Sequence, residues 1–74
     1  MMYGEMTAQQ QYFHDVAWTE LKSANQCMLV NRKARAQYHI REAMFYLAKV
    51  PAEFIEPELQ QNINKIDQLI TRGY

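Results

Sequence analysis

The chain has 74 residues, 49% of them hydrophobic, and its eight Lys and Arg residues balance its eight Asp and Glu residues. This length suits a single domain over residues 1–74 and excludes a large α/β enzyme. Zero formal charge removes the usual basis for non-specific nucleic-acid binding, and only two Gly and two Pro argue against a many-turned β fold. We therefore expect an all-α protein.

A first helix is predicted from Ala8 to Cys27 or slightly beyond. Thr7 and Gln10 have the spacing of a capping box, in which each side chain bonds the backbone of the other residue. Apolar residues then recur three and four positions apart, as on one stripe of a helix. The stripe consists of Phe13, Val16, Ala17, Leu21, Ala24 and Met28.

A second helix is predicted over 32–50, ended by Pro51, which lacks an N–H donor. Its stripe consists of Ala36, Ile40, Ala43, Met44 and Leu47. At ~100° per residue this stripe points about 140° away from the first. A break near 29–32, with Asn31 as the N-cap of the second helix, removes that conflict and gives a hairpin. One continuous helix of roughly 43 residues is the alternative.

A third helix is predicted to begin at Pro57 and to stop before Gly73. Its stripe consists of Leu59, Ile63, Ile66 and Ile70. Phe54 and Ile55, in the connector over 52–56, are expected to plug one end of the core. The fold class is therefore a small antiparallel three-helix bundle, or a long helical hairpin with a short C-terminal helix.

Apolar residues exceed what so small a core can cover. Five aromatic residues lie off the main stripes of the first two helices: Tyr12, Trp18, Tyr38, Phe45 and Tyr46. Surplus apolar surface usually marks an interface, where aromatic residues are enriched. We expect these residues to bind a second copy of the chain or another protein. The alternative is that they lie flat on the surface of a monomer.

Basic residues gather at the predicted start of the second helix, as Arg32, Lys33 and Arg35, with Arg41 further along. Cations there oppose the helix dipole, whereas free amides with arginine can bind phosphate or carboxylate. The first alternative function is therefore a sponge for an anionic nucleotide, with Tyr38 or Trp18 stacking on the base; solvated surface charges would explain the same residues. A DNA-binding regulator is a second alternative, although the bases do not line a single face.

Catalytic and metal-binding patterns are weak. His39 and Glu42 are three residues apart, but this pair occurs once, whereas di-iron bundles repeat Glu-x-x-His on two helices. Cys27 lies ~20 Å along the predicted helix from His14, and only His39 could approach it across the hairpin. We predict no enzymatic activity, no catalytic residues, no metal and no cofactor.

One Cys cannot form an internal disulfide, which suggests a reducing compartment. The sequence has no apolar run of ~18–20 residues, and the first five residues lack the basic flank and apolar stretch of a signal peptide. We expect a cytoplasmic protein without membrane association.

The sequence of residues 32–48 resembles a helix of a known group of proteins. It begins with Arg32 and continues through Ile40 into Glu42-Ala43-Met44-Phe45. This run resembles a helix of small phage-encoded helical proteins, among them the anti-CBASS sponges that sequester cyclic nucleotides. The resemblance implies a phage counter-defence protein that acts by stoichiometric binding in the host cytoplasm, and it assigns no ligand residues. The function we expect is that of a non-enzymatic helical binding protein, a phage or mobile-element inhibitor that acts by stoichiometric interaction with a host defence protein.

Overall fold

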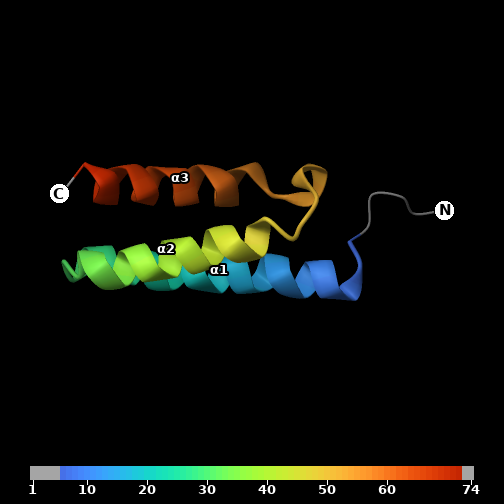
Figure 1. Ribbon diagram of the computed structural model, residues 1–74, viewed down its shortest axis with the longest axis horizontal. Coiled ribbons are helices and arrows are strands. Elements are labelled where there is room, and N and C mark those ends of the chain that lie inside the picture. The colour runs from blue at the N-terminus through green and yellow to red at the C-terminus, as the bar shows by residue number, and fades with distance from the viewer. Residues whose placement is uncertain (1–5, 73–74) are drawn as a thin grey trace.

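The computed structural model describes residues 6–72, which form three α-helices and one short 3₁₀ helix. The elements are α1 (Ala8–Leu29), α2 (Lys33–Leu47), η1 (Ala52–Phe54) and α3 (Pro57–Thr71). The helices α1 and α2 form an antiparallel hairpin, and α3 returns alongside it (Figure 1). The prediction of a small all-α bundle is confirmed, and the alternative of one continuous helix over 8–50 is wrong.

The start of α1 follows the predicted capping box. Thr7 Oγ1 accepts a hydrogen bond of 3.1 Å from the Gln10 N–H, and the Thr7 N–H donates to Gln10 Oε1 at 3.0 Å. A helix start leaves four amides without backbone partners, and the capping box satisfies two of them, those of Thr7 and Gln10.

The turn between α1 and α2 differs from the prediction. Asn31 has φ 61°, its N–H donates to the Met28 carbonyl, and the Arg32 N–H donates to the Cys27 carbonyl. This is a Schellman motif, which ends a helix with one residue in the left-handed region. Asn31 therefore terminates α1, and Arg32 is the N-cap of α2, without a side-chain cap among the described residues.

The second helix is shorter than predicted, because α2 ends at Leu47 and not at Val50. The Lys49 and Val50 amides bond carbonyls three residues back, at Tyr46 and Leu47. Pro51 disfavours the helical conformation at Val50, and the chain tightens into a turn before it. Val50 remains buried and extends the core stripe of α2 by one position.

The interface between α1 and α2 is lined by alanines seven residues apart. Ala17 and Ala24 on α1 and Ala36 and Ala43 on α2 are all 0% exposed. Seven residues make almost two full turns, so each pair shares one face of its helix. Alanine allows the two backbones to approach closely, and α1 and α2 contact each other far more extensively than either contacts α3.

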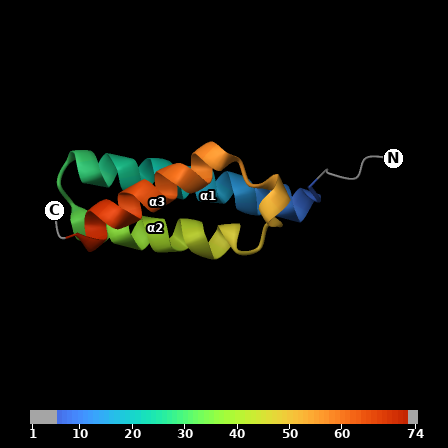
Figure 2. The ribbon, with the colours of Figure 1, turned by 90° about the horizontal axis from the view of Figure 1, so that it is seen from above.

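The third helix crosses the hairpin obliquely. Figure 2 shows α3 starting over α1 and ending over α2, and its Leu59, Ile63 and Ile66 are buried. These residues close the core on that side of the hairpin together with Leu21, Ile40 and Leu47. α3 contacts α2 somewhat more extensively than it contacts α1.

Several predicted stripe residues lie only partly in the core. They flank the buried stripes and are half-buried: Phe13, Val16, Met28, Met44 and Ile70. Ile55 packs against the core as predicted, while Phe54 is half-buried. Gly73 lies outside the described residues. No helix within residues 6–72 has the length and apolar character needed to cross a bilayer.

A buried histidine takes a core position that the apolar pattern did not identify. His14 is 3% exposed, and its Nε2 accepts the Glu56 N–H at 3.5 Å. Glu56 is the N-cap residue of α3. His14 therefore connects the first half of α1 to the start of α3.

Candidate interaction surface

The five aromatic residues predicted to form an interface separate into two groups. Tyr12, Tyr38 and Phe45 are exposed, at 61%, 59% and 55%. Trp18 and Tyr46 are half-buried and pack against the core. The first group therefore offers the larger part of each side chain to a partner.

An aromatic cluster, formed by Tyr12, Phe13, Phe45 and Tyr46, lies where α1 begins and α2 ends. Ring centroids are 5.7 Å apart for Tyr12–Phe13, 5.8 Å for Phe13–Tyr46 and 5.3 Å for Phe45–Tyr46. The Lys49 ammonium lies 4.6 Å from the Phe45 ring centre, a cation–π distance. The sequence predicted Phe13 as a stripe residue of the first helix and gave no role to Lys49. Their place in this cluster depends on the antiparallel register of the hairpin.

A second stripe runs along α2 on the side away from the core, here called the outer face. It consists of Ala34, Tyr38, Arg41 and Phe45, which are all exposed. Their spacing of four, three and four residues repeats that of the buried stripe of α2. From the sequence, Tyr38 and Phe45 were predicted as separate interface residues. Their regular spacing with Ala34 and Arg41 is the signal that would have assigned them to one helix face.

Charged residues line one edge of the outer face. Arg35 and Glu42 are seven residues apart and therefore lie along the same edge. The single ion pair within residues 6–72 joins His39 Nδ1 to Glu20 Oε1 at 2.6 Å, between α2 and α1. Arg35, Arg41 and Glu42 thus have no charged partner inside the described part of the chain.

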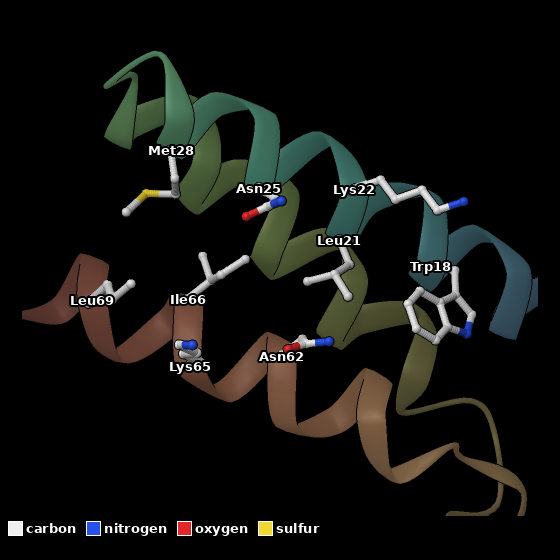
Figure 3. A pocket seen from close by; sticks show the side chains of 9 residues that line it. All are labelled: Trp18, Leu21, Lys22, Asn25, Met28, Asn62, Lys65, Ile66 and Leu69. Carbon is white, nitrogen blue, oxygen red and sulfur yellow. The ribbon is translucent and has the colours of Figure 1, made fainter.

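Trp18 lines a groove between α1 and α3. Figure 3 shows Trp18, Asn25 and Met28 on the α1 wall facing Asn62 and Leu69 on the α3 wall. The groove holds about 320 Å³, with Leu21 and Ile66 also in its lining and Lys22 and Lys65 on its two walls. Trp18 was expected on an interface, but its surroundings could not be predicted without the oblique placement of α3.

The predicted anion-binding residues lie at two places. Arg32 is the N-cap of α2, and Lys33 and Arg35 lie in its first turn, with no acidic residue in that turn. Arg41 is six residues beyond Arg35, ~9 Å along the helix and on another side. The fold therefore brings three of the four cations together at one end of the hairpin.

Residues with metal-binding or nucleophilic chemistry are dispersed. Residues 6–72 contain no group of three or more His, Cys, Asp or Glu side chains placed to hold a metal ion. Cys27 is a half-buried free thiol. His39 pairs with Glu20, which lies seven residues and ~10 Å along α1 from Cys27, so the hairpin register does not set a base beside the thiol.

Comparison with known proteins finds no matching protein family, no matching curated protein and no matching solved structure. The proposals below therefore rest on the geometry of this chain and on the resemblance described above for residues 32–48.

Proposed function

We propose that this chain is a non-enzymatic binding protein that acts by forming stoichiometric complexes through the exposed aromatic residues of its α1–α2 hairpin. The observation that carries this proposal is the exposure of Tyr12, Tyr38 and Phe45 by more than half on one small hairpin. Fully burying one such side chain contributes roughly 1.5–3 kcal/mol. Large rings of this kind are typical anchors of protein interfaces.

The partners we propose are a second copy of the chain and a host protein. The resemblance of segment 32–48 to phage counter-defence proteins supports a host defence protein as the target, inhibited because its surface is occupied. Such a mechanism needs a complementary surface and no catalytic group, which agrees with the dispersed chemistry of the described residues.

The test is affinity capture from a lysate of the native host cells with three immobilised proteins: the wild type, a triple variant and a control. The triple variant carries Tyr12→Gln, Tyr38→Gln and Phe45→Gln. The control carries Leu29→Gln and Val30→Gln, which remove two other exposed apolar side chains at the far end of the hairpin.

The proposal predicts one host protein retained in fixed ratio by the wild type and the control, and lost with the triple variant. Equal capture by all three proteins, or no protein retained in a fixed ratio, contradicts it.

An anionic nucleotide is the second candidate ligand. The observation that favours it is the start of α2, where Arg32, Lys33 and Arg35 adjoin amides without a side-chain cap among the described residues. Titration calorimetry with a panel of cyclic nucleotides should then give binding that Arg32→Ala with Lys33→Ala weakens at least about tenfold. An absence of heat across the panel removes this candidate.

A further inference from the structure

We propose that two copies of the chain pair through the outer faces of α2, with the two helices antiparallel about a two-fold axis that passes between Tyr38 and Arg41. The inference rests on the proposed function and deepens it by assigning one partner, a second copy, to one surface. The groove between α1 and α3 and the start of α1 stay outside this contact.

The outer face has the pattern of an antiparallel helix pair. Its residues Ala34, Tyr38, Arg41 and Phe45 repeat at the four-and-three spacing that keeps a seam in contact. In the proposed register Phe45 lies over the second copy's Ala34, so that a large ring meets a small side chain. Tyr38 lies beside the second copy's Arg41, where a guanidinium can stack on the ring.

The charges at the edge of the outer face complement this register. Glu42 lies beside the second copy's Arg35, and the two-fold axis makes this pair twice. Neither side chain has a charged partner within residues 6–72 of its own copy. Edge positions of this kind set partner and orientation in helix pairs.

A competing register places like charges together. A shift of seven residues sets Glu42 against the second copy's Glu42, and Arg35 against its Lys49. Like-charge contacts disfavour this shifted register, so the charges favour the register proposed here over it.

The experiment is sedimentation equilibrium of the full chain and two charge-reversal variants, Arg35→Glu and Glu42→Arg. Each variant alone forms two like-charge pairs across the interface, so its dimer Kd should rise by about tenfold or more. An equal mixture of the two variants forms a heterodimer in which both pairs are again opposite in charge. Its Kd should return close to that of the wild type.

The matched control is the pair Lys22→Glu and Glu53→Arg, which changes the net charge by the same amounts at exposed positions away from the outer face. Both should dimerise as the wild type does, and mixing them should bring no gain. The proposal is overturned if the wild type sediments as an 8.8 kDa monomer up to near-millimolar concentration. It is equally overturned if the wild type dimerises and the charge reversals have no effect, a result that leaves the partner-binding function standing.

Discussion

The methyl groups of four alanines set the distance between α1 and α2. Ala17, Ala24, Ala36 and Ala43 are all fully buried, so a larger side chain at any of these positions must displace its neighbours. Protein interiors are close-packed, so a change of a few methylenes at such a position is strongly felt.

Replacement of Ala43 by Leu should lower the free energy of unfolding by about 1–3 kcal/mol, since the added carbons force the helices apart. Urea denaturation followed by circular dichroism measures the loss. The matched change Ala48→Leu, at an exposed position at the end of the same helix, should alter stability by less than about 0.5 kcal/mol. Equal losses for both variants would mean that the alanine seam does not set the helix distance.

Replacement of His14 by Ala should destabilise the fold by about 2–3 kcal/mol. The change leaves a cavity in the core and deprives the Glu56 N–H of its acceptor. His14→Gln keeps an acceptor on a side chain of similar reach, and denaturation should show a smaller loss. A Gln variant no more stable than the Ala variant would argue that the bond to Glu56 contributes nothing.

At the scale of elements, the turn between α1 and α2 shows where sequence reasoning succeeds and where it stops. The change in stripe direction correctly located a break near 29–32. The role of Asn31 was misassigned, because asparagine suits both an N-cap and the left-handed position that ends a helix. Only the backbone hydrogen bonds from Asn31 and Arg32 back to α1 distinguish the two roles.

Because Asn31 is in the left-handed conformation, substitutions by Gly and by Val should change the stability of the fold in different directions. Asn31→Gly should keep or raise stability, because glycine adopts φ 61° without a side-chain clash. Asn31→Val should lower stability by about 1–2 kcal/mol, because a β-branched residue disfavours that region. Thermal unfolding of both variants measures the difference, and a Val variant as stable as the Gly variant would contradict the Schellman turn.

In the other elements too, features specified by one segment could be predicted, and features that depend on several segments could not. The capping box and the apolar stripe of α3 are local signals, and the structure follows them. Pro51 correctly predicted that the second helix ends before it, but not where. The early end of α2 depends on how Pro51 tightens the preceding turn. The aromatic cluster depends on the register of the hairpin, and the groove at Trp18 depends on the crossing angle of α3. No single segment of the sequence specifies the register or the angle.

At the scale of the whole molecule, the three helices of the bundle are not packed equally closely. The hairpin of α1 and α2 is closely packed, whereas α3 contacts each of them less extensively and leaves the groove at Trp18 open. Segments with fewer tertiary contacts open at lower free energy than the rest of a fold.

Native-state hydrogen exchange should therefore show α3 opening below the global unfolding free energy, by at least about 1 kcal/mol compared with the middle of α1 and α2. Amides at Ile63 and Ile66 report on α3, and those at Leu21 and Ile40 report on the hairpin. A single opening free energy for all four amides would contradict an unequal bundle.

The central claim is that the outer face of α2 is covered by protein in solution, and hydroxyl-radical footprinting at increasing chain concentration tests it most directly. Oxidation of Tyr38 and Phe45 should fall from low micromolar to near-millimolar chain, while oxidation of the equally exposed Tyr12 stays constant. Oxidation of Tyr38 and Phe45 that does not change with concentration would contradict the account.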